Sequence, residues 1–261
     1  MRSYTRHQLK EDKFAQAITD QVHWTVEHRN ILIIAAAILL VAVLGGYFAW
    51  EQMQRKDDQA SMALGAALRT YNAPLRDAQQ PLPPDMKSFG SAKERSQAAQ
   101  KEFQKVADDF TSTRNGKYAL YLSGVTSIEA GDAKTGEETL KKVADLGDKD
   151  LSVLGKFALA SLYASQNKDA DVVKMYRDVI QADANTVPKT TAQLELASYY
   201  ESKNNLTEAV KIYEDIQKSE ESTRKANAPK PAKDAKPAPE VKTGLEEMAA
   251  RKIEELKRAA R

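Results

Sequence analysis

The sequence contains no cysteine, and its three histidines all lie before residue 29. The absence of cysteine excludes disulfides, thiolate nucleophiles and cysteine-based metal sites. The only histidines are His7, His23 and His28. The rest of the chain therefore lacks the two side chains most used for nucleophilic and general-base catalysis near neutral pH. We predict that the protein is not an enzyme, and we expect no catalytic residue, no cofactor and no metal site.

The charges are nearly balanced and show no concentrated basic face. The chain carries 39 Lys and Arg against 37 Asp and Glu, which gives a formal net charge of +2. A nucleic-acid-binding surface needs cations gathered on one face or along one helix. We therefore expect protein partners and no nucleic acid.

One hydrophobic run interrupts this polar sequence. Residues 31–50, ILIIAAAILLVAVLGGYFAW, contain no charged and no strongly polar side chain. As a helix they would span roughly 30 Å, the thickness of the hydrocarbon core of a bilayer. The run lies too far from the N-terminus, and is too long, for the apolar part of a cleaved signal peptide. We predict an uncleaved single-pass transmembrane helix with Tyr47 and Trp50 at the membrane interface, where such aromatic rings concentrate.

The positive charges beside this run favour one orientation. They are Arg2, Arg6, Lys10, Lys13 and Arg29 before the run, and Arg55, Lys56 and Arg69 after it. Cytoplasmic flanks carry the excess of Lys and Arg. We therefore expect residues 1–30 to be a cytoplasmic segment, with the large C-terminal part on the other side of the membrane.

A repeat occupies the second half of the chain. The segment 159–180, LASLYASQNKDADVVKMYRDVI, recurs at 196–217 as LASYYESKNNLTEAVKIYEDIQ, with ten of twenty-two positions identical at an offset of 37 residues. This period is typical of helical repeat arrays. In each copy a large–small pair precedes a tyrosine on a first helix, and an apolar stripe at i, i+4 and i+7 follows on a second. The predicted packing residues are Leu159, Ala160, Tyr163, Val172, Tyr176, Val179, Leu196, Ala197, Tyr200, Ala209, Tyr213 and Ile216.

Weaker copies extend the repeat toward the N-terminus. One copy lies 36 residues upstream, around Gly124 and Gly136. A further copy is divided by residues 72–90, a loop that contains four prolines. Ser91 and Glu94 predict a capping box at the start of the helix that follows this loop.

Three other tyrosines are candidates for contact with a ligand. Tyr199 aligns with Leu162 and lies beside a packing position, so its ring is predicted to face a groove or solvent. Tyr118 and Tyr121 lie at the start of the weaker copy upstream, where groove contact and core packing both remain open. These three are the candidate groove contacts.

The composition changes after residue 218. Residues 219–242 contain four prolines with interleaved lysines and are predicted to form a disordered linker. Residues 243–261 are predicted to form an amphipathic helix, with Thr243 and Glu246 as a second capping box. Three roles remain open for this tail: a solubilising spacer, a helix that reaches a partner, or a cap folded back on the repeats.

Together these patterns predict an all-α chain. The transmembrane helix precedes an α-solenoid of about four helical hairpins over residues 53–218, and the linker and the amphipathic helix follow. A single hairpin cannot bury its own apolar stripe, so neighbouring hairpins must stack.

The repeat residues resemble the tetratricopeptide repeat. In that family a large and a small residue precede an aromatic on the first helix, and small and aromatic residues follow on the second. The residues that match are Leu196, Ala197, Tyr200, Ala209 and Tyr213. The family's first-helix tryptophan and its closing proline are missing here. The resemblance implies a solenoid that binds proteins.

The order of segments also resembles that of YfgM-type proteins. The resemblance covers about residues 8–218 and includes LKEDKFAQAITDQVHWTVEHRN before the apolar run. It implies a protein of the bacterial inner membrane, with a cytoplasmic N-terminus and periplasmic repeats. It also implies Sec translocon components and exported proteins as partners, because members of this family act there as accessory chaperones.

Two functions follow from these expectations. The leading hypothesis is a non-enzymatic, membrane-tethered interaction module, an accessory chaperone for exported proteins at the Sec translocon. The alternative is a structural scaffold in an envelope assembly or export complex, with the C-terminal helix as its docking element.

Overall fold

The structure is a computed structural model that describes residues 29–76, 83, 86–182, 184–227 and 242–260. These residues form helices and their connections, with one isolated bridge and no strand among them. The all-α class predicted from the sequence is therefore confirmed. Most of the predicted cytoplasmic segment, 1–30, and most of the predicted linker, 219–242, lie outside the described residues.

The chain divides into two units, residues 1–58 and residues 59–261. The helices are α2 (Arg29–Tyr71), α3 (Ala92–Asp109), α4 (Arg114–Glu129), α5 (Ala133–Ala144), α6 (Lys149–Ser165), α7 (Asp169–Gln181), α8 (Lys189–Ser202), α9 (Leu206–Asn227) and α10 (Gly244–Ala259).

The first unit contains the apolar part of α2. By length and composition this helix could cross a membrane, and none of its most apolar stretch is buried against the rest of the chain. Side chains around the helix, such as Ile38 and Val41, are exposed. The rings of Tyr47 and Trp50 lie next to each other at the end of the apolar run, with centroids 6.2 Å apart. This apolar stretch of α2 is therefore not buried against any other described residue.

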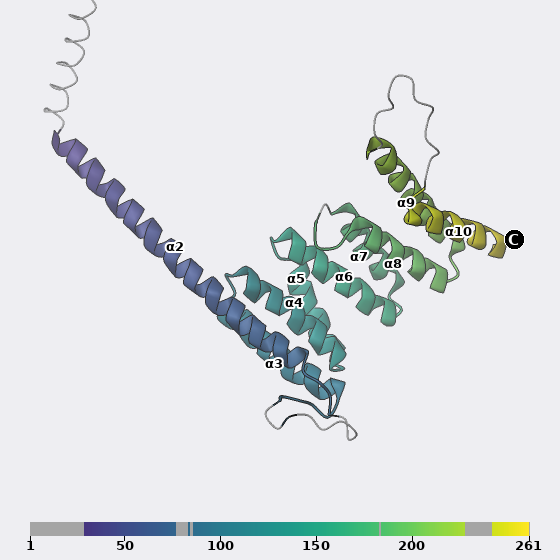
Figure 1. Ribbon diagram of the computed structural model, residues 1–261, viewed down its shortest axis with the longest axis horizontal. Coiled ribbons are helices and arrows are strands. Elements are labelled where there is room, and N and C mark those ends of the chain that lie inside the picture. Colours follow the sequence, from purple (N-terminus) through teal and green to yellow (C-terminus); the bar gives the residue numbers. More distant parts are fainter. Residues whose placement is uncertain (1–28, 77–82, 84–85, 183, 228–241, 261) are drawn as a thin grey trace, which may run out of the picture. The chain divides into compact units, whose positions relative to one another are not determined.

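In the second unit, successive helices pack as hairpins (Figure 1). The last turns of α2 pack on α3 through Leu64, Ala67 and Phe103. The pairs α4–α5, α6–α7 and α8–α9 follow in order, and each pair also contacts the helix that comes next. The result is a stack of four hairpins in which α10 packs on α9.

The hairpin turns share one backbone feature. Gly131, Asn167 and Asn204 have positive φ angles of 92°, 57° and 56°. They end α4, α6 and α8, where the amide of the following residue bonds a carbonyl five positions back, as Asn205 does with Tyr200 at 2.8 Å. This is the bond of the Schellman motif, which glycine and asparagine favour because they tolerate left-handed backbone. The polar turns of the repeat therefore end the first helix of each of these hairpins.

Glycines set the spacing of α4 and α5. A Cβ atom on Gly136 would lie 2.4 Å from Cγ1 of Ile128 and 2.9 Å from the carbonyl oxygen of Gly124. A Cβ atom on Gly124 would lie 2.9 Å from Cγ of Leu140. The two helices therefore approach too closely for any larger residue at either position. This close crossing explains why the weak copy of the repeat has glycines where the stronger copies have alanine or, at Val172, valine.

The two predicted capping boxes differ in the structure. Thr243 and Glu246 form a complete box, in which each side chain accepts a bond from the other residue's amide at 3.1 Å. The side chain of Ser91 accepts from the amide of Glu94, but the carboxylate of Glu94 accepts from the amide of Gly90. The second half of the Ser91 box is therefore displaced by one residue.

Helix α9 extends past the predicted end of the repeats. It continues to Asn227, nine residues beyond position 218 (227 − 218), so residues 219–227 are helical and do not belong to a disordered linker. The Glu221–Lys225 ion pair, at 2.5 Å, lies on this extension one turn apart. The extension also supplies contacts to α10, which a linker would not.

Replacing Gly136 with alanine should destabilise the protein. Overpacking costs about 1–3 kcal/mol, whereas alanine's helix propensity returns at most about 1 kcal/mol. The matched control is Gly65→Ala in α2, where a Cβ atom would meet nothing closer than 3.9 Å. Thermal unfolding followed by circular dichroism should show a lower midpoint for Gly136→Ala and an unchanged or higher one for Gly65→Ala. Equal midpoints would contradict the close crossing.

Candidate protein-interaction surfaces

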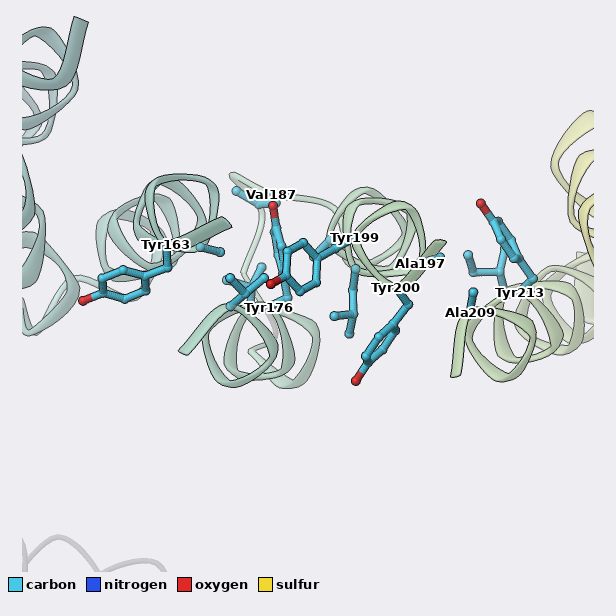
Figure 2. Close-up of a cluster of buried hydrophobic side chains, with 14 of the residues drawn as sticks. Tyr163, Tyr176, Val187, Ala197, Tyr199, Tyr200, Ala209 and Tyr213 are labelled. Carbon is cyan, nitrogen blue, oxygen red and sulfur yellow. The ribbon is translucent and has the colours of Figure 1, made fainter. Parts of the chain in front are cut away.

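The twelve residues predicted to pack within the repeats are all buried. Tyr200, at 8 %, is the most exposed of them. All twelve belong to one hydrophobic cluster that extends from α5 to α10, and Figure 2 shows its tyrosines at successive levels of the stack. These side chains join the hairpins and expose little surface to a ligand.

Three tyrosine hydroxyls in this cluster donate hydrogen bonds to carboxylates. The pairs are Tyr163–Glu137 at 3.3 Å, Tyr199–Asp169, and Tyr213–Glu201 at 2.7 Å. In each pair the two residues come from different helices. A hydrogen bond to a charged acceptor is stronger than one between neutral groups. The pairs therefore add directional contacts to the apolar stack.

Lysines bind the carboxylates of all three pairs, and in two of the pairs the lysine also lies over the tyrosine ring. Lys168 binds Glu137 at 3.3 Å, and Lys203 binds Asp169 at 3.0 Å. Their ammonium groups lie 4.9 and 5.5 Å from the centroids of the neighbouring tyrosine rings, within the range of cation–π attraction. Lys252 of α10 binds Glu201 at 3.0 Å, so the combination of tyrosine, carboxylate and lysine recurs at three levels of the stack.

Burial and these bonds change the acidity of the tyrosines. Burial, followed by the hydrogen bond to Asp169, raises the pKa of Tyr199 to about 12. Burial and the bond to Glu201 also raise the pKa of Tyr213. In both cases the protonated hydroxyl is the donor. The bonds between helices therefore depend on the tyrosines remaining neutral.

The prediction that Tyr199 faces a groove or solvent is wrong. Its side chain is 9 % exposed and packs in the cluster beside Tyr176 (Figure 2). The reason is that α8 packs on α7 as well as on α9, so two faces of the helix are buried. The counterpart of Tyr199 in the preceding repeat, Leu162, is buried too.

Tyr118 and Tyr121 are half-buried on α4. Their rings are stacked with centroids 5.8 Å apart. Tyr118 packs against the cluster of the first hairpin that contains Leu64, Ala67 and Phe103, whereas Tyr121 packs against that cluster and against the cluster that extends from α5 to α10. Neither lines either of the two clefts described next. Contact between these two rings and a ligand stays a prediction.

A cleft of about 650 Å³ lies between α5 and α7. Its floor includes Leu159 and Tyr163 of α6, and charged side chains surround it. Many of these charges are paired: Glu137 with Lys141 at 2.7 Å and with Lys168 at 3.3 Å, and Lys156 with Asp178 at 3.6 Å. Because many of the charged groups at the rim are paired with one another, this cleft offers few charged groups to a partner.

A larger groove, of about 810 Å³, lies on the first hairpin. Its apolar lining consists of Ala63, Ala66, Ala67, Ala73, Pro74, Met86 and Val106. Its charged residues are Arg69, Lys87, Glu102, Lys105 and Asp109. We call this surface the first-hairpin groove. The sequence did not lead us to predict this groove, although Ala63, Ala66 and Ala67 place three small side chains close together on one helix.

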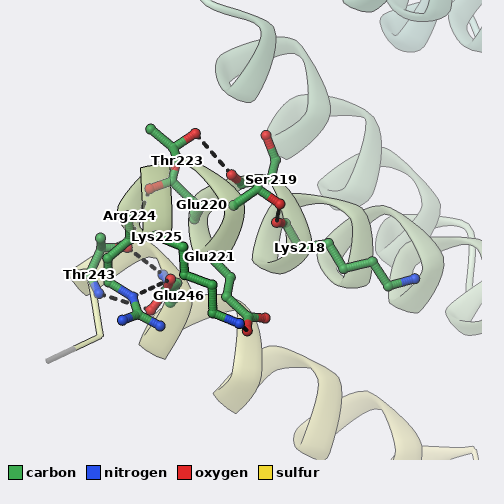
Figure 3. A network of polar contacts seen from close by, with 10 residues as sticks. Lys218, Ser219, Glu220, Glu221, Thr223, Arg224, Lys225, Thr243 and Glu246 are labelled. Atoms are coloured by element: carbon green, nitrogen blue, oxygen red, sulfur yellow. Dashed lines mark hydrogen bonds and ion pairs between the residues drawn. The ribbon is translucent and has the colours of Figure 1, made fainter. Parts of the chain in front are cut away.

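At the other end of the stack, α10 covers α9 (Figure 3). Ala249, Ile253 and Leu256 are buried in the main cluster. Glu246 is also buried, where its carboxylate binds Arg224 of α9 at 3.2 Å. Of the three roles left open for the tail, the structure shows the helix folded back on the repeats.

Alkaline pH should weaken the stack through Tyr199. Because its pKa in the folded protein is about 12 and its ordinary value is 10.0, the stabilisation is complete below pH 10 and is lost as the pH rises toward 12. Tyr199→Phe should therefore lose less stability than the wild type between pH 9 and pH 11.5. Urea unfolding at pH 9 and at pH 11.5 measures the change in the free energy of unfolding of each protein, with Tyr47→Phe in the first unit as control. Equal losses in the wild type and Tyr199→Phe would contradict the assignment.

Comparison with known proteins agrees with the repeat architecture. A family model described as a tetratricopeptide repeat-like domain matches residues 23–175. This range ends within α7, so α8 to α10 lie outside it. No curated protein and no solved structure gave a significant match. The match covers more than half of the chain, and the protein belongs to the tetratricopeptide repeat-like family.

Proposed function

We propose that the protein is a non-enzymatic, membrane-tethered interaction module that acts as an accessory chaperone for exported proteins at the Sec translocon. Tetratricopeptide repeat-like domains commonly mediate contacts between proteins, and the family match supports this part of the proposal. The observation that carries it is the first-hairpin groove, whose lining is largely apolar and open. An apolar groove suits clients that have not yet buried their own apolar side chains.

The tether is the second part of the proposal. The apolar run of α2 supports it through its length, its composition and its lack of buried side chains. A membrane anchor would hold the repeats near emerging clients and raise their effective concentration, so that weak contacts suffice. In the proposed orientation the N-terminus is cytoplasmic and the repeats lie in the periplasm. The similarity of segment order to YfgM-type proteins supports the choice of the Sec translocon.

The scaffold alternative loses its main support. It requires the C-terminal helix to be free for docking. In the structure the apolar side of α10 is used within the chain, through Ile253 and Leu256. A scaffold would therefore need another docking element among the described residues.

Co-purification from mild detergent tests the proposed function. The full chain is compared with a variant in which residues 31–50 are replaced by a scrambled, polar-substituted sequence. We expect translocon components and several exported proteins to be enriched at least fivefold with the full chain only. Equal recovery from both chains would rule out the tethered chaperone. One stoichiometric partner in place of many clients would favour the scaffold.

A further inference from the structure

The first-hairpin groove lies on the side of α3 that faces away from α4. Gln100 and Gln104 of α3 point toward α4, where both bond Ser123. Lys105 and Asp109, which line the groove, lie on the opposite side of the helix, because each residue turns the chain by about 100°. In a stack of hairpins this is the side on which a preceding helix would pack. No helix among the described residues covers this side, and the groove therefore marks an uncovered end of the described stack.

The other end shows which kind of helix covers such a surface in this protein. Helix α10 buries an apolar stripe and keeps its charges at the edges. Two of these pair with the repeats: Lys252 with Glu201 at 3.0 Å, and Lys257 with Glu214 at 2.9 Å. At this end of the stack, an amphipathic helix covers the last hairpin, and charges at the edges of that helix pair with charges of the repeats.

The floor of the groove leaves room for large side chains. Ala63, Ala66, Ala67 and Ala73 supply only methyl groups, and Val106 closes the floor on α3. A partner helix that packs here must fill this space with larger residues such as leucine, because unfilled apolar space forfeits dispersion contacts. The partner should therefore present a stripe of large apolar residues.

The charges at the edges of the groove define the partner further. Lys87 is neutralised by Glu102 at 2.8 Å. Arg69 on α2 and Lys105 on α3 make no hydrogen bond or ion pair with another described residue. Two cations on the two walls thus face one remaining carboxylate, that of Asp109. An acidic partner would supply the missing charge.

We propose that the first-hairpin groove binds an amphipathic helix of a partner protein, with leucine-like side chains on the alanine floor and carboxylates paired with Arg69 and Lys105. The proposal rests on the function as a protein-interaction module and names the class of partner for this surface. Because edge charges act mainly on specificity and on the rate of association, the sign of the partner's flanks should decide its binding.

Two synthetic helices test the proposal with the full chain in mild detergent. Both are eighteen residues long, share one leucine stripe and carry a fluorescent label, and they differ only in flanking glutamates or flanking lysines. Fluorescence anisotropy should show at least tenfold tighter binding of the glutamate peptide. The double variant Arg69→Glu, Lys105→Glu should reverse this preference. The control Lys174→Glu, at an exposed position of α7, should leave it unchanged.

A second variant tests the position of the peptide. Ala66 lines the groove and is exposed, so Ala66→Arg should fold normally while it fills the groove, and it should weaken binding at least tenfold. No binding of either peptide, equal binding of both, or binding unaffected by Ala66→Arg would overturn the proposal. A dimer of the wild type that Ala66→Arg converts to a monomer would overturn it as well, since a second copy would then occupy the groove.

The outcome also separates this proposal from the proposed function. If neither peptide binds while clients co-purify equally with the wild type and Ala66→Arg, the groove proposal fails, and the chaperone function stands with its clients bound at another surface. If the glutamate peptide binds as expected but no client co-purifies, the groove proposal stands and the chaperone function fails.

Discussion

Every helical hairpin in this protein leaves an apolar face that only a neighbouring helix can cover, and the rest of the structure depends on this constraint. Leu140 of α5 and Leu196 of α8 have no exposed surface because helices pack against them from both sides of the stack. Glycines permit the close approach of α4 and α5. Tyrosine–carboxylate pairs add direction to the apolar contacts. Stability is therefore built from contacts between neighbours.

The same constraint gives the two ends of the stack different roles. Helix α10 covers α9 and presents mostly charged residues outward, so the C-terminal end is closed. The first hairpin has no such cover among the described residues, and its outer side is the groove with Arg69 and Lys105 on its walls. We propose that a partner protein binds at the first-hairpin groove, where no described helix covers the stack. The contacts of α10 with α9 show that an apolar stripe with charged edges can cover such a surface.

The sequence predicted the parts of this structure that repeat. The register of 159–180 on 196–217 located twelve buried side chains, because size and polarity at those positions are set by contacts that recur every 37 residues. It also contained the signal that Tyr199 is buried, since the aligned Leu162 is apolar. The carboxylate partners could not be predicted, because Asp169 lies 30 residues from Tyr199 and on another helix. The docking of α10 could not be predicted either, since an amphipathic stripe alone does not say which surface covers it.

Stability in this stack is local to neighbouring helices, and hydrogen exchange on the full chain with and without residues 243–261 tests this claim most directly. Removing α10 uncovers α9 but leaves the first hairpin untouched. We predict that amides of α8 and α9 lose protection by at least tenfold, whereas amides of α3 and α4 keep theirs. Equal loss of protection from α3 to α9, or unchanged protection in α9, would contradict the account.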